Sequence, residues 1–239
     1  MVKYNPCESS STVERHLPKV VVASSNLVFR SKHGSSERRP DFLRKVKYMP
    51  LVIASNNAHK VKEIEKILGN FFDDVLTMKD VGLNMEIEET GSTFYENSLI
   101  KAEAVTKATG FPSLADDSGL CVDCLNGAPG VYSARYAGEE HDDDKNIDKL
   151  LAEMKGETNR KARFVTVLTL LYPDGRKITV EGTTEGKIIE ERKGTAGFGY
   201  DPVFYSTELN KTFGEATEEE KNSVSHRGNA LRKLEEILI

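Results

Sequence analysis

The chain has 239 residues, of which 38% are hydrophobic and 30% are charged, and its formal net charge at pH 7 is −5. This length fits one large domain or two small ones, and the composition is that of a globular protein. No apolar run in the sequence approaches the roughly 20 residues that span a membrane. We therefore expect no membrane partner, and the negative net charge argues against a protein that coats nucleic acid.

The charge is unevenly distributed along the chain. Residues 1–49 hold 10 Lys or Arg against 4 Asp or Glu, a net charge of +6, so residues 50–239 hold 23 against 34, a net charge of −11. The first 49 residues also lack a helical or strand period, which predicts a basic, poorly ordered extension before a domain over 50–239. An organellar presequence, a basic interaction tail or a stretch upstream of a true start at Met49 remain open, although the four acidic residues weaken the presequence.

The three cysteines cannot all pair, and no secretory segment precedes them, which indicates a reducing, cytoplasmic compartment. Organellar targeting by residues 1–48 stays open. Cys121 and Cys124 form a C-x-x-C, but no second such pair and no histidine pair accompanies them. We interpret them as two small apolar side chains on a helical turn and not as a redox or metal site.

An α/β pattern begins at Pro50. Residues 51–54 predict a buried strand, and apolar residues at helical spacing over 61–68 predict a helix that ends at Gly69. Thr93 and Glu96 form a capping box for a second helix, which a Gly and a Pro at 110 and 112 stop. A short strand over 113–115 then leads into an acidic turn.

The second half of the chain also alternates between predicted helices and strands. Residues 147–154 predict a helix whose acidic N-terminus is Asp142-Asp143-Asp144, and residues 164–172 and 178–181 predict a hairpin around Pro173-Asp174-Gly175. A further strand is predicted over 186–189, and a capping box at 217–220 precedes a terminal helix over 231–238. The order implies an elongated mixed β-sheet flanked by helices, with two lobes around a central substrate cleft.

Polar clusters lie at the ends of these predicted elements, where turns present side chains to a ligand. The first follows the opening strand and combines a helix N-terminus with a lysine, which favours an anion, although a simple helix cap explains it equally well. Its members are Ser55, Asn56, Asn57, Ala58, His59 and Lys60.

Two further clusters are acidic. Glu88-Glu89-Thr90-Gly91 and Asp116-Asp117-Ser118-Gly119 place carboxylates side by side, where they repel each other unless solvent or a cation intervenes. Mg²⁺ takes one or two carboxylates and leaves its other positions for water and phosphates. A carboxylate that does not bind the metal could accept a proton from attacking water. A solvated acidic turn is the plainer alternative.

The last cluster mixes aromatic rings with cations: Phe198-Gly199-Tyr200-Asp201, Lys221 and His226-Arg227. Rings can stack on a base, a carboxylate can accept from a purine N–H, and a guanidinium can donate to carbonyl or phosphate oxygens. His226 alone is more typical of a structural histidine. The sequence contains neither a Walker A motif nor a G-x-G-x-x-G, which argues against a P-loop NTPase and a Rossmann dehydrogenase.

These clusters, in this order, closely resemble the inosine triphosphate pyrophosphatase family, which hydrolyses noncanonical purine nucleoside triphosphates. The resemblance extends from about Leu51 to Leu238. Five segments carry it: ASNNAHKVKEI, EETGSTFYENSLIKA, LADDSGLCVDCLNGAPGVYSARYAG, GFGYDPVF and EEEKNSVSHRGNAL.

The resemblance implies an Mg²⁺-dependent homodimer that converts ITP, dITP or XTP to the monophosphate and pyrophosphate. Asp117 would be the proton acceptor and a metal ligand, with Glu88 the more favoured of the two adjacent glutamates as second ligand. The triphosphate would contact residues 55–60, Lys101, Ser118 and Lys221. The base would be enclosed by Phe198, Gly199, Tyr200 and Asp201 and recognised by His226 and Arg227.

Two alternatives stay open at this point. One is a hydrolase of the Maf type, which acts on pyrimidine or modified nucleotides. The other is a non-catalytic module that senses a nucleotide in the same cleft. Loss of a carboxylate would favour the module, yet Glu88, Asp116 and Asp117 are all present.

Overall fold

The computed structural model describes residues 50–69, 71–72, 74–138 and 141–239, so the predicted extension over 1–49 lies outside the described residues. Seven strands form one mixed sheet in the order β2-β1-β3-β4-β5-β6-β7. β1 runs parallel to both β2 and β3, and every later pairing is antiparallel. The strands are β1 (Leu51–Ile53), β2 (Val75–Thr77), β3 (Ser113–Val122), β4 (Lys161–Leu171), β5 (Lys177–Ile188), β6 (Phe204–Ser206) and β7 (Lys211–Thr212).

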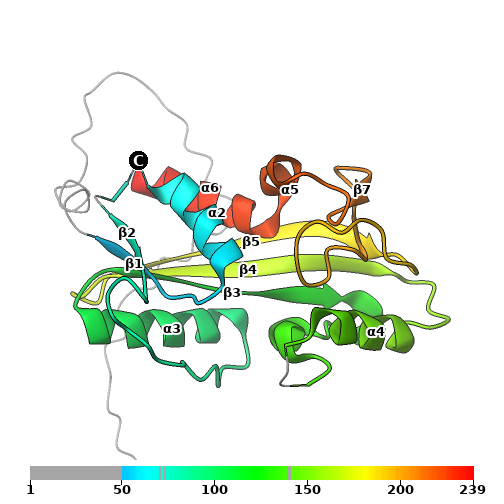
Figure 1. Cartoon of the computed structure of the whole chain (residues 1–239), viewed down its shortest axis with the longest axis horizontal. Helices are drawn as coiled ribbons and strands as arrows, with labels where there is room; N and C mark the ends of the chain where they lie inside the picture. Colours follow the sequence, from blue (N-terminus) through cyan, green and yellow to red (C-terminus); the bar gives the residue numbers. More distant parts are fainter. Residues whose placement is uncertain (1–49, 70, 73, 139–140) are drawn as a thin grey trace, which may run out of the picture.

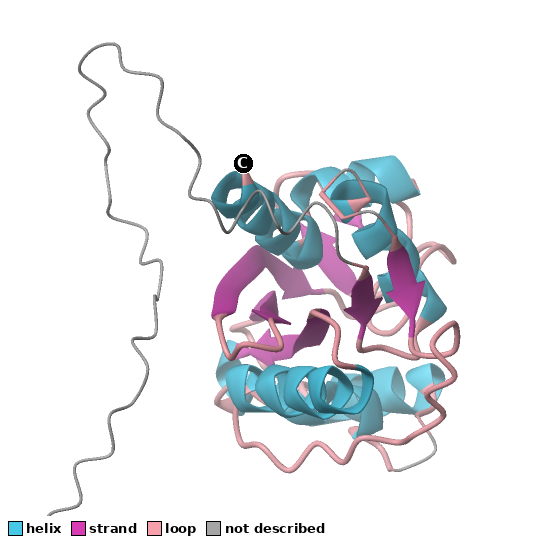
Figure 2. Ribbon diagram, turned by 90° about the vertical axis from the view of Figure 1, so that its left-hand side faces the viewer, coloured by secondary structure: helices cyan, strands magenta, loops and turns pink. Residues whose placement is uncertain are grey.

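Helices cover both faces of this sheet (Figures 1 and 2). The helices α2, α5 and α6 lie on one face, and α3 and α4 lie on the other. Their bounds are α2 (Ala58–Leu68), α3 (Phe94–Thr109), α4 (Asp143–Glu153), α5 (Glu218–Val224) and α6 (His226–Leu238), with short 3-10 helices η1 (Asp123–Leu125) and η2 (Gly130–Arg135). The predicted mixed sheet flanked by helices is confirmed. Among the described residues, no helix is long and apolar enough to cross a membrane.

Capping signals placed several helix ends correctly, although α6 begins at His226 and not near Leu231. The Thr93 capping box is present in both directions, and Gly110 ends α3 in the left-handed conformation at φ 72°. The second predicted box, Thr217 with Glu220, opens α5. Asp142 caps α4 through its side chain, as expected for an acidic helix N-terminus.

The strands were predicted less well. The expected short strand over 113–115 continues to Val122, because β3 pairs with β4 over its whole length. The expected strands over 178–181 and 186–189 are parts of one strand, β5. Acidic and small residues broke the apolar pattern, but backbone pairing with β4 carries both strands through them.

Three hydrophobic clusters place the core. One lies between α2, α6 and the sheet around Leu114 and Leu168, and a second lies on the opposite face under α3 around Ala102 and Ala115. The third surrounds Phe204 at the far end of the long strands, between α4 and β6. Separate clusters at the two ends of β3 leave a polar region between them, where the candidate site lies.

Cys121 and Cys124 are free thiols. Cys121 belongs to β3 and only Cys124 lies on a helical turn, η1, so half of that prediction is corrected. Burial raises the pKa of both thiols, which makes a reactive redox pair unfavourable at neutral pH.

Candidate active site

A cavity of about 750 Å³ opens between the β1–α2 turn and the loop that precedes β6. Most of the predicted site residues line it, although they come from five separate segments of the chain. The predicted residues on its wall are Ser55, Asn56, Asn57, Lys60, Lys101, Ser118, Phe198, Gly199, Tyr200, Asp201, Lys221 and His226. Ala58 and His59 form the first turn of α2, and their side chains lie outside the described part of the structure.

The end of β1 creates the opening. β1 stops at Ile53, and its last ladder bond runs from the Ala54 N–H to the Leu114 carbonyl at 2.8 Å. β3 continues for eight more residues and keeps β4 as its neighbour, so Asp116, Asp117 and Ser118 lie in mid-strand beside the end of β1. The prediction that they follow the end of their own strand was wrong. Successive side chains of a strand point to opposite faces, so the two carboxylates diverge.

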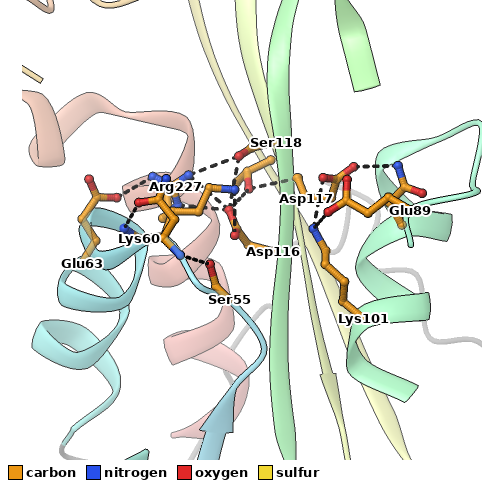
Figure 3. A network of polar contacts seen from close by, with 12 residues as sticks. Ser55, Lys60, Glu63, Glu89, Lys101, Asp116, Asp117, Ser118 and Arg227 are labelled. Atoms are coloured by element: carbon orange, nitrogen blue, oxygen red, sulfur yellow. Dashed lines mark hydrogen bonds and ion pairs between the residues drawn. The ribbon is translucent and has the colours of Figure 1, made fainter. Parts of the chain in front are cut away.

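Asp116 lies between two cations on the face of α2 and α6 (Figure 3). Its Oδ1 is 3.0 Å from Lys60 Nζ, and its Oδ2 accepts from Arg227 Nη2 at 3.1 Å. Burial alone would raise the pKa of the Asp116 carboxyl, but Lys60 and Arg227 outweigh it and hold this pKa far below its usual range. Asp116 is therefore a permanent anion that fixes two positive side chains.

Arg227 is only 1% exposed and is not part of the cavity wall. Its guanidinium also donates to Glu63 Oε2 at 2.7 Å and to Ser118 Oγ at 3.2 Å. The geometry thus gives Arg227 a different place from the predicted base contact, because its donors are directed to protein acceptors. It ties α6 to α2 and to β3.

Asp117 lies on the opposite face, against α3 (Figure 3). Its Oδ1 is 3.2 Å from Lys101 Nζ, and its Oδ2 accepts from Asn97 Nδ2 at 3.2 Å. Lys101 also contacts Glu89 Oε1 at 2.7 Å. Burial raises the pKa of Asp117 above its ordinary value, although Lys101 opposes the shift. A carboxylate with a raised pKa is a better proton acceptor than an ordinary one.

The two adjacent glutamates differ in position. Glu89 is half-buried on the cavity wall, whereas Glu88 is exposed and is not among the lining residues. Both belong to residues 83–91, which form neither helix nor strand. The described conformation therefore brings Glu89, and not the favoured Glu88, next to Lys101.

The other end of the cavity is formed by the loop before β6. Asp201 Oδ2 accepts from the Phe198 N–H at 2.9 Å and from Lys221 Nζ at 2.5 Å, and this ammonium lies 4.5 Å from the centre of the Phe198 ring. Gly197 has φ of +80°, and a Cβ there would come within 2.0 Å of the Asp201 carboxylate. Only glycine fits, so the sequence GFGYD encodes a tight loop that folds around Asp201.

His226 lies on the wall of this same end. It is buried, its ring stacks on Phe164 with centroids 4.9 Å apart, and its Nδ1 has no hydrogen-bond partner among the described residues. Burial, with help from Arg227 and Lys221, holds the pKa of His226 well below 6.5. The imidazole is therefore neutral at pH 7, and its buried Nδ1 is a polar atom without a partner among the described residues.

The acidic end of the cavity presents few carboxylates to a divalent cation. Among the described residues, no group of three or more His, Cys, Asp or Glu is arranged to enclose a metal ion. Mg²⁺ commonly binds through one or two carboxylates, with waters and phosphate oxygens completing its shell. Asp117 and Glu89, which both contact Lys101, could supply such sparse ligation, whereas Glu88 is exposed in this conformation.

Some members of the site were not predicted. Glu63 and Asn97 hold Arg227 and Asp117, and Asp143, expected only as a helix-end acid, accepts from the Gly199 N–H at 2.7 Å. Asn97 follows the capping-box glutamate directly, but nothing in the sequence distinguished it from an ordinary helical residue. Partners in such networks are chosen by tertiary packing.

The fold and cavity define an α/β protein whose cleft combines lysines at one end with aromatic rings and a neutral imidazole at the other. The model of the Ham1 family matches residues 51–237, so the chain belongs to the Ham1 family. It is 50% identical over 195 residues to the dITP/XTP pyrophosphatase of Clostridium perfringens, which covers 78% of this chain and 96% of that one. The dITP/XTP pyrophosphatase of Bacillus subtilis is 51% identical over 189 residues, at 78% and 96% coverage.

Solved structures agree with the fold. The Ham1 protein of Staphylococcus aureus superposes with a TM-score of 0.74 at 43% identity, covering 79% of this chain and 97% of that one. A HAM1 protein from Coxiella burnetii gives a TM-score of 0.75 at 40% identity, with coverage of 80% and 98%. The similarity spans nearly the whole of both relatives.

Proposed function

We propose that this protein hydrolyses noncanonical purine nucleoside triphosphates, namely ITP, dITP and XTP, to the nucleoside monophosphate and pyrophosphate. One observation carries the proposal. A single cavity is lined by Lys60, Lys101 and Asp116 at one end and by the Phe198–Asp201 loop with His226 at the other. Asp117 is not a lining residue, but it contacts Lys101 at 3.2 Å. The size and polarity of the cavity suit a nucleotide, and relatives at about half identity bear the name dITP/XTP pyrophosphatase.

The triphosphate is assigned to the β1–α2 turn. The N-terminus of α2 directs free N–H groups and the positive end of its dipole towards the cavity, where Lys60 adds a full charge. The Asn57 side chain accepts from the Lys60 N–H at 3.3 Å, so this residue also caps the helix, as the plainer interpretation expected. Capping and phosphate binding are compatible because several N–H groups of the first turn lack intrahelical partners.

Asp117 is assigned as the proton acceptor for the attacking water. Its raised pKa suits that role, and Asn97 and Lys101 fix its two oxygens in place. Lysines around the phosphates stabilise the negative charge that develops on the leaving pyrophosphate. Lys101 and Lys60 approach from the two faces of β3, so they can act on different phosphates of the same ligand.

Mg²⁺ is proposed as the cofactor, held by Asp117 and Glu88; when bound, it would polarise a phosphoryl oxygen and offset developing charge. Glu89 already forms an ion pair with Lys101, and among the described residues no ion pair engages Glu88. The proposal requires Glu88, which is exposed and lies in a segment without helix or strand, to turn towards Asp117 when the metal binds.

Base selection is assigned to His226 and the loop at Phe198–Asp201. Hypoxanthine and xanthine carry a 6-oxo group where adenine carries an amine. A neutral imidazole has one N–H and one acceptor nitrogen; the tautomer that presents its N–H to the base donates to the oxo group but leaves an amine unsatisfied. Arg227 contributes indirectly, because it holds the start of α6 and Ser118 in position.

A homodimer is proposed as the assembled form. Tyr132 on η2 is 57% exposed, and the guanidinium carbon of Arg135 lies 5.2 Å from the centre of its ring. Exposed aromatic and arginine side chains are enriched in protein interfaces. Light scattering is expected to give twice the chain mass, and Tyr132→Ser with Arg135→Ser to shift the equilibrium to monomer.

The function is tested by a panel of ITP, dITP, XTP, ATP, GTP and pyrimidine triphosphates with Mg²⁺ and identification of the products. We expect pyrophosphate and monophosphate, with ITP and XTP turned over far faster than ATP or GTP. Equal turnover of all purines, orthophosphate as first product, or a preference for pyrimidine nucleotides would refute the assignment.

A further inference from the structure

The acidic end of the cavity already contains a cation that belongs to the protein. Lys101 Nζ lies 2.7 Å from Glu89 Oε1 and 3.2 Å from Asp117 Oδ1, and its side chain is 11% exposed. The two carboxylates come from an irregular segment and from a central strand, and they would repel each other without a positive charge between them. Lys101 thus has the electrostatic role of a bound metal ion in this conformation.

Neither oxygen of Asp117 lacks a partner. Oδ1 contacts Lys101, and Oδ2 accepts from Asn97 Nδ2. A divalent cation that coordinates Asp117 must therefore displace one of these contacts or stand within a few ångströms of an ammonium, where like charges repel strongly. Either Lys101 or Asn97 must therefore move away from Asp117 when the cation binds.

Asn97 is held too firmly to be the one that moves. It is 0% exposed, and its Oδ1 accepts from the Gly91 N–H at 2.8 Å while its Nδ2 binds Asp117. A Cβ at Gly91 would come within 2.6 Å of that Oδ1, so the close contact is built into the sequence. Lys101 has a long flexible stem, and it lines the cavity into which its ammonium can swing.

We propose that Lys101 is an exchangeable internal cation. Its ammonium pairs with the Asp117 carboxylate until the metal binds, and it then moves to form an ion pair with a phosphate of the nucleotide. Metal and nucleotide consequently favour each other's binding. When the metal takes the Asp117 carboxylate from Lys101, a phosphate of the nucleotide gives the ammonium a new partner. This inference rests on the proposed function for the identity of the nucleotide, but its metal-binding half can be measured without any substrate.

The test measures Mn²⁺ binding to the nucleotide-free full chain by electron paramagnetic resonance, for the wild type, Lys101→Met and Lys107→Met. Lys107 is an exposed lysine of the same helix and controls for the loss of one positive charge. Lys101→Met is expected to bind Mn²⁺ about tenfold more tightly than the wild type, a typical coupling between sites. Lys107→Met is expected to match the wild type.

For the nucleotide, the same substitution is expected to weaken binding. At saturating Mg²⁺, the KM for ITP is expected to rise in Lys101→Met and to stay unchanged in Lys107→Met. Unchanged or weaker Mn²⁺ binding by Lys101→Met would overturn the inference, because Lys101 would then serve only to assemble the carboxylates. Lys101→Gln repeats the measurement if the Met variant does not fold, as judged by circular dichroism. Absence of ITP hydrolysis by the wild type refutes the function and leaves the Mn²⁺ result intact.

Discussion

Asp116 and Asp117 are neighbours on β3, yet they meet different surroundings on the two faces of the sheet. Asp116 is completely enclosed by Lys60 and Arg227, which hold its pKa far below the usual range. Asp117 faces α3 with one lysine and one amide, and its pKa is raised by burial. Two adjacent aspartates thus differ in character: Asp116 is a fixed structural anion, whereas Asp117, with its raised pKa, is the one proposed as proton acceptor.

Asp117→Asn should have the largest effect on activity. The amide keeps the shape of the side chain but cannot accept a proton, so kcat for ITP is expected to fall about a thousandfold. Some loss of thermal stability is also expected, because the amide has one carbonyl oxygen and can accept from only one of Asn97 and Lys101; kcat is therefore compared for the folded variant. Full activity in this variant would remove Asp117 from the mechanism.

Asp116→Asn should act mainly on stability. It leaves Lys60 and Arg227 without their shared anion in a buried site, and breaking such a network costs about 3 kcal/mol of unfolding free energy. Asp174→Asn is the matched control, because that carboxylate forms an exposed pair with Arg176 and its loss costs less than about 1 kcal/mol. Urea unfolding measures both, and equal losses would contradict the contrast.

The lowered pKa of Asp116 also predicts how the stability of the protein depends on pH. The pKa of folded Asp116 lies below its ordinary value of 3.8, so its contribution is complete above that value and is lost as the pH falls below it. The stability gap between the wild type and Asp116→Asn is therefore expected to be constant near neutral pH and to narrow below about pH 4. A gap that stays constant down to acid unfolding would contradict this assignment.

Substituting Glu88 and Glu89 one at a time distinguishes the proposed metal ligand from the ion-pair partner of Lys101. Glu88→Gln is expected to raise the Mg²⁺ concentration for half-maximal activity at least about tenfold, a loss typical of metal sites. Glu89→Gln removes only the ion pair with Lys101 and should have a smaller effect. The reverse order would move the ligand assignment to Glu89, the residue that lines the cavity in this conformation.

His226→Phe should have the smallest of these effects, on selectivity alone. The ring keeps its stacking on Phe164 but loses its polar atoms, so the preference for ITP over ATP is expected to fall about tenfold. His141, an exposed histidine that also lines the cavity, provides the control His141→Phe. An unchanged ratio of kcat/KM values in His226→Phe would place base recognition elsewhere in the loop.

Helix positions followed largely from local patterns, whereas the gathering of the site residues was implied by the family resemblance. Capping boxes at Thr93 and Thr217 fixed helix starts because the signal consists of two residues three positions apart. Strand lengths did not follow, since β3 and β5 run through acidic and small residues that only pairing with β4 accommodates. The local sequence predicts that each strand ends at these residues, but pairing with β4 extends it.

The sequence by itself determined the class of fold and the residue types that meet in the cleft, because these depend on periodicity and on motif order. Only the tertiary structure decided which face each residue occupies. It placed Asp116 and Asp117 on opposite faces of β3, turned Arg227 away from the cavity and put Glu89 in contact with Lys101. Those outcomes depend on contacts between segments far apart in the chain, which no local pattern encodes.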